Sequence, residues 1–444
     1  MDTRSVHFQV DERQVEARRN AASVGGVIRE IRSDSFDTLH QPLTINCIDA
    51  GSNQAGQRNR VKVNTDNLLR PTWAEISLGR LRRNFEYVRR LAGPRRVMAV
   101  VKADAYGHGA AMVARTLAEA GADWFGVATV EEALELRAAG VEKPILLLGG
   151  LYMSDPASLI EYRLTPIVSS TARLDTYAEC ARRYGKPIEF HLHVDTGMGR
   201  LGIPPDRVKA FIERYRGLQG IVLKGLSTHL ASAEDMVASQ TEDQAARFKE
   251  ALQQVRTMGV EPEWVHVANS AALVAGWPFP ENMVRIGALL YGYCLPLILP
   301  PGKKAPEPPQ VEPVLTLKSR VVYLKDVPCG TPLGYGAAFH TRRRSRIATV
   351  PVGYADGLTR ALSNRGHAIV RGCRARIVGN ISMDLTLLDV TDVPGVDIGD
   401  EVVLLGQADH CSITAQEIAD LVGTVPYEIL CSIGKRVPRI YVDS

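Results

Sequence analysis

Eight short apolar runs alternate with helical patterns between residues 97 and 286 of this 444-residue chain. An unbroken apolar run of four to eight residues suits a strand that is buried on both faces of a parallel sheet. Eight such strands alternating with helices predict an α/β fold, a (β/α)8 TIM-type barrel. An open doubly wound sheet is the alternative, but no GxGxxG follows the first run. The runs are residues 97–101, 124–128, 145–148, 165–168, 188–194, 221–228, 264–267 and 283–286.

Lys102 stands at the carboxyl end of the first run, within the stretch VMAVVKADAYGHG (97–109). A lysine at a strand end often extends its ammonium group to water, because burying that charge is costly. The alternative is an amine in a partly desolvated pocket, where it loses its proton and attacks a carbonyl carbon. Since the carboxyl ends of barrel strands carry the chemistry of this fold, the position favours the second interpretation.

Polar side chains follow the later barrel strands as well. His191 and His193 lie two apart on the fifth strand, and an HxH pair can bind a metal, so a metal-dependent hydrolase is an alternative. No further ligand set completes such a site in the sequence. Several polar strand ends that converge on one barrel mouth instead indicate a binding site. These residues are Arg200, His229, His266, Asn269, Ser270 and Arg285.

The pattern changes after residue 295. A proline-rich connection, residues 296–313, leads to short strand-like runs separated by Gly, Pro, Asn and Asp, with one clear helix at 414–422. These features predict a mainly β C-terminal domain. We therefore divide the chain into a polar and mobile extension over residues 1–70, the barrel over 71–310 and the β domain over 311–444.

Composition excludes several classes of function. The net charge of +4 is small and the charges are interspersed, so neither nucleic acid nor a membrane surface is an expected partner. The seven cysteines are scattered without a CxxC pair, which argues against a disulfide framework or a zinc site. No apolar run is long enough to span a bilayer, and the N-terminus lacks the apolar core of a signal peptide. A cytoplasmic enzyme is therefore expected.

From about residue 71 to residue 441 the chain resembles the alanine racemases. The resemblance implies a pyridoxal-phosphate barrel followed by a β domain, in a homodimer with shared active sites. It also implies interconversion of L- and D-alanine, which supplies D-alanine for peptidoglycan. The motifs that carry it are AVVKADAYGHG (99–109), VDTGMGRLG (194–202), STHLASAE (227–234), HVANSAAL (266–273), RIGALLYG (285–292), LGYGAAF (333–339), PVGYADG (351–357), SMD (382–384) and RVPRIY (436–441).

The resemblance implies two acid/base groups. Lys102 would hold the cofactor covalently and serve as one base, and Tyr335 would reach the partner subunit's site as the other. Two bases on opposite faces of a planar intermediate satisfy the needs of racemisation. A phenol is a weak acid in water, so His229 together with Arg285 would help it to ionise. Arg285 would also face the pyridine nitrogen and keep it unprotonated, which makes the ring a weaker electron sink.

The resemblance also implies the residues that bind the cofactor and the substrate. Arg200 would bond the phenolate oxygen of the cofactor and the carboxylate of the substrate. Met383 would bind that carboxylate through its amide, and Asp384 would orient Tyr335. The remaining cofactor-binding residues, mostly around the phosphate, would be Tyr106, His229, Asn269, Ser270, Gly287, Ala288 and Tyr427.

The chain departs from the family at His193, where many members carry a carbamylated lysine that anchors the arginine corresponding to Arg200. We predict no carbamate here. A neutral His193 would accept a hydrogen bond, whereas an imidazolium would recruit an anion, and either would support Arg200 differently. Ser382 replaces a frequent cysteine, which is a mild change.

Other functions on the same plan stay open at this point. A racemase with broader specificity needs only a larger pocket. A pyridoxal-phosphate decarboxylase of the ornithine or diaminopimelate type shares the barrel and β domain, but it would place a cysteine at the position of Tyr335. A non-catalytic pyridoxal-phosphate-binding regulator would consist of the barrel alone.

Overall fold

The structure, a computed structural model, describes residues 68–443. These residues lie within one compact unit, Arg60–Ser444. The extension expected over residues 1–70 falls outside the described residues as far as residue 67.

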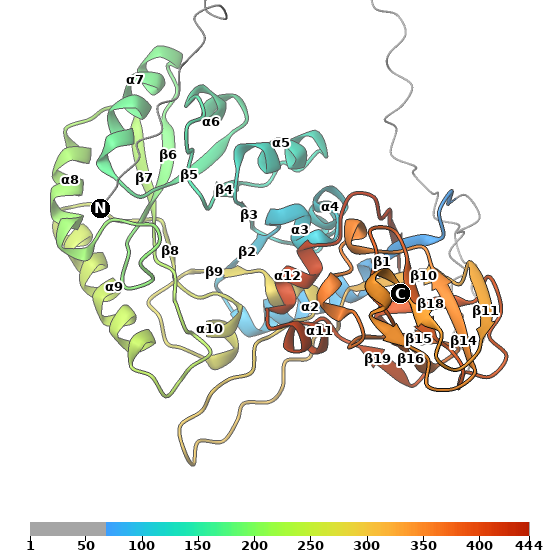
Figure 1. The fold of residues 1–444 in the computed structure, drawn as a ribbon. Coiled ribbons are helices and arrows are strands. Elements are labelled where there is room, and N and C mark those ends of the chain that lie inside the picture. Colours follow the sequence, from blue (N-terminus) through green and yellow to red (C-terminus); the bar gives the residue numbers. More distant parts are fainter. Residues whose placement is uncertain (1–67, 444) are drawn as a thin grey trace, which may run out of the picture. The chain divides into compact units, whose positions relative to one another are not determined.

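The first part of the described chain forms a closed barrel of eight parallel strands, as the sequence predicted (Figure 1). Each strand pairs with the next along the chain, and the barrel closes where Met98 of the first strand lies beside Arg285 of the last. The strands are β2 (Arg96–Val100), β3 (Trp124–Val127), β4 (Ile145–Leu147), β5 (Leu164–Val168), β6 (Ile188–His193), β7 (Ile221–Ser227), β8 (Trp264–His266) and β9 (Met283–Ile286).

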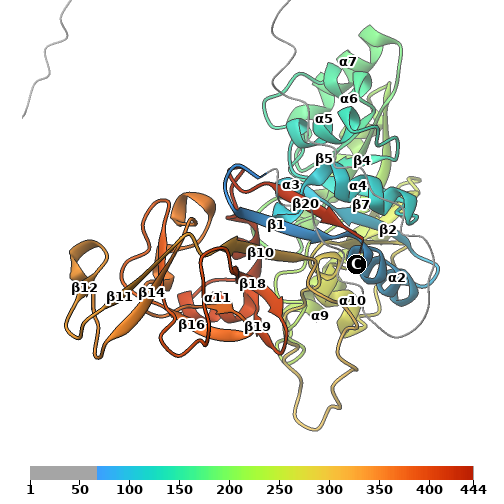
Figure 2. The ribbon, with the colours of Figure 1, turned by 90° about the vertical axis from the view of Figure 1, so that its right-hand side faces the viewer.

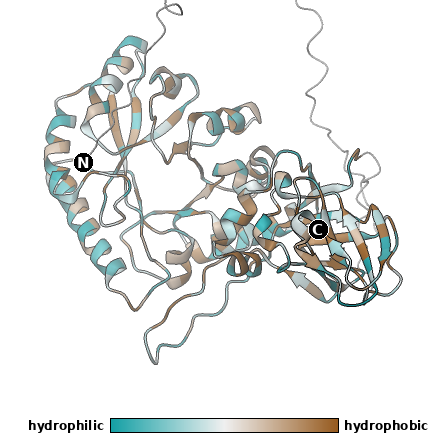
Figure 3. Cartoon of the chain, in the orientation of Figure 1, coloured by the Kyte–Doolittle hydropathy of each residue, from teal (hydrophilic) through white to brown (hydrophobic). Residues whose placement is uncertain are grey.

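Alternate residues of the apolar runs face opposite sides of the barrel wall. Along β2, Val97 and Ala99 join the large core between strands and helices, whereas Met98 points inward and packs with Trp124 and Met283. Because both faces are covered, the run is apolar throughout rather than alternating. The hydropathy colouring shows apolar residues on the strands and polar residues on the surrounding helices (Figure 3).

Helices connect the strands, and local signals set their ends. The Ser77 hydroxyl accepts the Arg80 N–H at the first helical turn, 3.1 Å away, and Gly185 ends α7 in the left-handed conformation. The helices are α2 (Leu78–Ala92), α3 (Lys102–Gly107), α4 (Ala110–Glu119), α5 (Val130–Ala138), α6 (Ala157–Glu161), α7 (Leu174–Tyr184), α8 (Val208–Arg216), α9 (Gln240–Thr257) and α10 (Ser270–Ala275).

The C-terminal part is mainly β, in agreement with the sequence analysis (Figure 2). Its ten-stranded sheet runs in the order β11-β14-β17-β16-β15-β18-β10-β1-β20, with β19 paired to β18. The strands are β1 (Thr72–Ser77), β10 (Leu315–Arg320), β11 (Tyr323–Val327), β14 (Ser345–Val350), β15 (His367–Val370), β16 (Cys373–Ile377), β17 (Thr386–Asp389), β18 (Glu401–Ala408), β19 (Cys411–Ile413) and β20 (Arg439–Val442).

Smaller elements complete the C-terminal part. A short hairpin, β12 (Pro332–Leu333) and β13 (Phe339–His340), encloses the single turn Tyr335–Ala337. The helices α11 (Ala415–Val422) and α12 (Pro426–Cys431) follow the last hairpin of the sheet.

Residues 72–77, which the sequence analysis placed at the start of the barrel segment, form β1 of the C-terminal sheet. Ala74 lies opposite Leu317 in an antiparallel pair, and Glu75 lies beside Ile440 in a parallel pair. These partners are more than 240 residues away in the sequence, so no local pattern could indicate the pairing. The two ends of the described chain thus meet in one sheet.

Candidate active site

Lys102 is the first residue of α3 and lies two residues after the end of β2, at the carboxyl end of the first barrel strand. Burial lowers the pKa of Lys102, the guanidinium of Arg200 lowers it further, and the Glu132 carboxylate opposes both by raising it. A neutral amine is the form that attacks a carbonyl carbon. The setting therefore favours the nucleophilic interpretation over an ammonium group extended to water.

Arg285, on β9, is a buried cation held by neighbouring loops. Its Nη1 donates to Nδ1 and the carbonyl oxygen of His266, at 2.9 and 2.7 Å. Its Nη2 donates to the carbonyl oxygens of Thr228 and Val267, at 2.7 and 3.0 Å. Burial lowers the pKa of Arg285 to about 10, so the guanidinium is charged at neutral pH. With both Nη groups occupied, the Nε–H is the donor left for a ligand.

Arg285 also determines which ring nitrogens of its histidine neighbours carry a proton. A guanidinium only donates, so Nδ1 of His266 must accept and its Nε2 must carry the hydrogen. That Nε2–H then donates to Nδ1 of His191, 2.8 Å away. By the same reasoning His229, whose Nδ1 lies 3.3 Å from Arg285 Nη2, carries its proton on Nε2.

The HxH pair of β6 does not form a metal site with other residues of the described chain. His191 Nδ1 is bonded to His266, and His193 Nδ1 lies 2.9 Å from the Ser227 hydroxyl. Among residues 68–443 no group of three or more His, Cys, Asp or Glu side chains is arranged to hold a metal ion. The metal-dependent hydrolase therefore has no support in this part of the chain.

The residues expected around a phosphate group lie together. Ser270 begins α10, and its hydroxyl accepts the N–H groups of Gly287 and Leu289, at 3.3 and 3.4 Å. A Cβ at Gly287 would lie 2.6 Å from the Tyr106 hydroxyl, so a larger residue here would displace the Tyr106 side chain. The Tyr106 ring in turn packs edge-on against Tyr427, with 6.0 Å between ring centroids.

Two other predicted residues lie next to Ser270 and Gly287 in the sequence. Ala288 begins the single turn Ala288–Tyr291 directly after Gly287. The side-chain oxygen of Asn269 accepts the Ala272 N–H at 3.0 Å, so it caps α10 and holds the loop that presents Ser270.

Arg200 lies in the loop after β6. The Asp195 carboxylate shapes this loop by accepting the N–H groups of Gly197 and Gly199, both at 3.0 Å. His193 is buried, and burial with the nearby cations Arg285 and Arg200 lowers its pKa to about 3. Burial and these cations therefore favour a neutral His193, whose Nδ1 lies 2.9 Å from the Ser227 hydroxyl.

Tyr335 lies far from Lys102 within the chain (Figure 2). The hairpin that carries Tyr335 is remote from α3 (Figure 2). Tyr335 is 74% exposed and Met383 is 52% exposed. The titratable neighbours of Lys102 are instead Arg200, Glu132 and Cys431. The two expected acid/base groups are thus not brought together within one chain.

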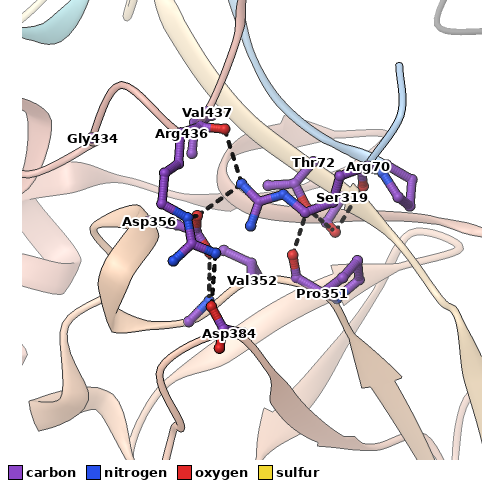
Figure 4. A network of polar contacts seen from close by, with 12 residues as sticks. Arg70, Thr72, Ser319, Pro351, Val352, Asp356, Asp384, Gly434, Arg436 and Val437 are labelled. Atoms are coloured by element: carbon purple, nitrogen blue, oxygen red, sulfur yellow. Dashed lines mark hydrogen bonds and ion pairs between the residues drawn. The ribbon is translucent and has the colours of Figure 1, made fainter. Parts of the chain in front are cut away.

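Asp384, expected to orient Tyr335, accepts a hydrogen bond from Arg436 Nη2 at 2.7 Å (Figure 4). Arg436 also contacts Asp356, whose fully buried carboxylate pairs with Arg70 at 2.7 Å and accepts the Gly353 N–H at 3.0 Å. Sequence reasoning did not identify Asp356 or Arg436. Together these groups link the SMD segment to Arg436, which precedes β20, and through Asp356 to Arg70, which precedes β1.

Asp356 and Asp384 share the partner Arg436 and differ in burial, which gives a direct prediction. Asp356→Ala leaves Arg70 and Arg436 without their buried acceptor and is expected to destabilise the protein by about 3 kcal/mol. Asp384→Ala, at an exposed pair, is expected to change the free energy of unfolding by less than about 1 kcal/mol. Denaturant unfolding of the two variants beside the wild type measures both values. Equal losses would contradict this account.

The barrel mouth fits pyridoxal phosphate. The Ser270 hydroxyl suits a phosphate group, Lys102 suits an aldehyde and the Nε–H of Arg285 suits a ring nitrogen. The cradle beside Gly287, which a Cβ would fill, matches this purpose.

Comparisons with known proteins agree with this geometry. Residues 76–295 match the alanine racemase N-terminal domain, and residues 314–441 match the alanine racemase C-terminal domain. The alanine racemase of Halothermothrix orenii is 43% identical over 375 residues, which cover 84% of this chain and 97% of the relative.

Solved structures show the same likeness. The alanine racemase of Clostridium difficile 630 has a TM-score of 0.78 and 35% identity, covering 85% of this chain and 97% of that one. The alanine racemase of Bartonella henselae, solved with covalently bound pyridoxal phosphate, has a TM-score of 0.73 and 33% identity, covering 84% and 99%.

The fold and the site together define a two-domain barrel enzyme that depends on pyridoxal phosphate. The chain belongs to the alanine racemase family, whose members are isomerases.

Proposed function

We propose that this chain interconverts L- and D-alanine by a two-base mechanism in a homodimer. The observation that carries the proposal is the shielded amine of Lys102 at the barrel mouth, whose pKa is lowered by burial. When bound, pyridoxal phosphate supplies an electron sink that stabilises negative charge on the substrate's Cα. The product D-alanine would serve peptidoglycan synthesis, and the free thiols of the described chain accord with a cytoplasmic location.

Lys102 would hold the cofactor and move a proton at one face of the substrate's Cα. Burial lowers its pKa, which increases the fraction of neutral amine that can act as a base. Arg285 would face the ring nitrogen through Nε–H and keep that nitrogen unprotonated. This weakens the electron sink, which favours return of the proton over side reactions.

Tyr335 of the partner subunit would act at the opposite face. In the barrel His229 accepts from Arg285 at Nδ1, so its Nε2–H is free to donate to the phenolate oxygen. Stabilising the phenolate in this way would allow the tyrosine to accept a proton. The high exposure of Tyr335 in the single chain accords with a surface that a second subunit covers.

Arg200 and Met383 would position the substrate. Arg200 carries a cation near Lys102 and has the geometry to bind a carboxylate or phenolate. Met383 of the partner subunit would offer its amide to the same carboxylate, with the segment held through Asp384 and Arg436. His193 would support the arginine's loop as a neutral residue, without a carbamate.

A stereospecific assay tests the activity. Purified protein with pyridoxal phosphate and L-alanine is expected to form D-alanine, followed by a coupled enzyme specific for the D isomer. Parallel incubations with L-serine and L-ornithine, read for racemisation and for carbon dioxide, measure specificity. Absence of D-alanine with turnover of another substrate would refute the proposal for alanine.

Mixing two inactive variants tests whether the sites are shared. One carries Lys102→Ala and the other Tyr335→Phe. If the bases come from different subunits, a mixed dimer has one site with both bases intact. Random exchange is therefore expected to restore about a quarter of the wild-type activity per subunit, because half of the dimers are mixed. If both bases came from the same chain, mixing the variants would restore no activity, and that result would refute the shared-site proposal.

A further inference from the structure

The backbone after Lys102 takes an unusual conformation. Four successive non-glycine residues, Ala103 to Tyr106, have φ between 52° and 55° and form a left-handed turn. Each such residue costs about 1–2 kcal/mol relative to a right-handed one. A strained segment of this kind persists only where its surroundings hold it.

Several contacts hold the far end of this turn. The Asp104 carboxylate accepts the Ala110 N–H at 2.7 Å, and the Asp104 carbonyl oxygen accepts the Gly109 N–H at 3.0 Å. At the near end, next to Lys102, the Ala103 N–H donates to Glu132 Oε1 at 2.7 Å. This is a side-chain contact from a neighbouring barrel connection.

Glu132 also lies at the start of α5, where the sequence Thr129-x-x-Glu132 forms a capping box. In such a box the glutamate bonds the N–H of the capping residue. The Glu132 carboxylate accepts three backbone N–H groups, and the bond from the Thr129 N–H is the longest of them, at 3.4 Å. The Ala128 N–H donates to Oε2 at 2.6 Å, and Ala103 occupies Oε1. One carboxylate therefore joins the segments that follow β2 and β3, which capping of α5 does not require.

We propose that Glu132 is a positioning residue that aims the amine of Lys102 by fastening the first amide of the left-handed turn. The proposal rests on the proposed function, in which Lys102 carries the cofactor. The negative charge of Glu132 has a separate effect, because it raises the pKa of Lys102. Position and charge are therefore distinguishable in an experiment.

Two variants separate these effects. Glu132→Gln removes the charge and puts an N–H₂ group in place of one carboxylate oxygen, so either the Ala103 contact or the contacts of Ala128 and Thr129 are lost. Glu132→Asp keeps the charge but shortens the reach. The matched control is Glu131→Gln, because Glu131 is its exposed neighbour on the same helix and lacks the contact with Ala103.

The first measurement is the rate at which full-length protein, stripped of cofactor, attaches pyridoxal phosphate at Lys102, followed from pH 6 to 10. Borohydride reduction and peptide mapping identify the modified lysine. Above its lowered pKa the Lys102 amine is neutral, so the plateau of the rate reports position and the midpoint reports the pKa. We expect the plateau to fall at least tenfold in both Glu132 variants. The midpoint should move to lower pH in Glu132→Gln only.

The second measurement is amide hydrogen exchange of residues 102–110 in the holoenzyme. We expect at least tenfold faster exchange in both Glu132 variants, with residues 72–92 unchanged as evidence of an intact fold. Plateau rates and exchange within twofold of the Glu131→Gln control would overturn the proposal while leaving the proposed function intact. Attachment in the wild type at a lysine other than Lys102 would refute the proposed function itself.

Discussion

Lys102→Ala is expected to lower kcat for alanine racemisation by at least about 10³-fold. The substitution removes both the covalent attachment of the cofactor and one of the two bases, and general base catalysis alone contributes about 10²–10⁴-fold. The titratable neighbours of Lys102 among residues 68–443 are Arg200, Glu132 and Cys431, and none of these is a lysine that could replace it. The visible absorbance of the bound cofactor and the D-alanine assay measure the two losses separately.

A surface lysine provides the control for this prediction. Lys186 is exposed in the connection before β6. Lys186→Ala is therefore expected to leave kcat and the cofactor absorbance unchanged. If Lys102→Ala kept more than a tenth of wild-type turnover, Lys102 would be neither the attachment site nor a required base.

Acid is expected to unfold the protein in the range where histidines normally gain protons. Burial, followed by the nearby Arg285 charge, lowers the pKa of His191, His193 and His229 to about 3, and that of His266 well below 6.5. In the unfolded chain these groups titrate near ~6.5. Between these values the unfolded state binds more protons, so stability falls as pH falls from about 6.5 towards about 3.

The size of the effect follows from linkage. Each such histidine contributes about 1.4 kcal/mol per pH unit within the window, so four contribute about 5 kcal/mol per pH unit. The stability of a whole domain is about 5–15 kcal/mol, which places the loss of structure within about two pH units. Denaturant unfolding at pH 7.0, 6.0 and 5.5, at fixed protein and cofactor concentration, measures how the free energy of unfolding changes with pH. In this range most carboxylates have not yet titrated.

Variants assign the slope to the buried rings. His191→Asn removes one titrating group and is expected to reduce the slope by about 1.4 kcal/mol per pH unit. His410→Asn, at an exposed position, is expected to leave the slope unchanged. A wild-type slope below about 1.4 kcal/mol per pH unit would show that these rings are protonated in the native state.

The barrel was predictable because its signals are local. Each of the eight apolar runs coincides with a strand of the barrel, since burial on both faces makes the whole run apolar. The position of Lys102 after the first strand then placed it at the mouth, where Ser270 and Arg285 also lie. Strand order along the chain was enough to bring these residues to one end.

The C-terminal part was predictable only in outline. The sequence indicated short strands and one helix after residue 313 but not how the strands pair, and β20 and α12 were not identified. Strands of an antiparallel sheet are short, and their partners depend on contacts distant in sequence. The hairpin around Tyr335 lacks the apolar alternation that would indicate a strand.

Glu132 shows a signal that sequence reasoning left unused. The spacing Thr129-x-x-Glu132 indicates a capping box, which predicts the start of α5 and a role for the carboxylate there. It does not indicate that the same carboxylate bonds the Ala103 N–H. That contact depends on β2 and β3 lying side by side in the barrel.

The barrel, the β character of the second part and the polar residues that follow the barrel strands can be recognised from the sequence alone. Periodic burial and the polar residues that end each run are properties of short segments, so they can be recognised without the fold. Only the tertiary structure decided that β1 joins the C-terminal sheet, that Asp384 pairs with Arg436 and that Arg285 orients the proton on His266. These contacts join residues that are distant in sequence, and their hydrogen-bond geometry exists only after the chain has folded.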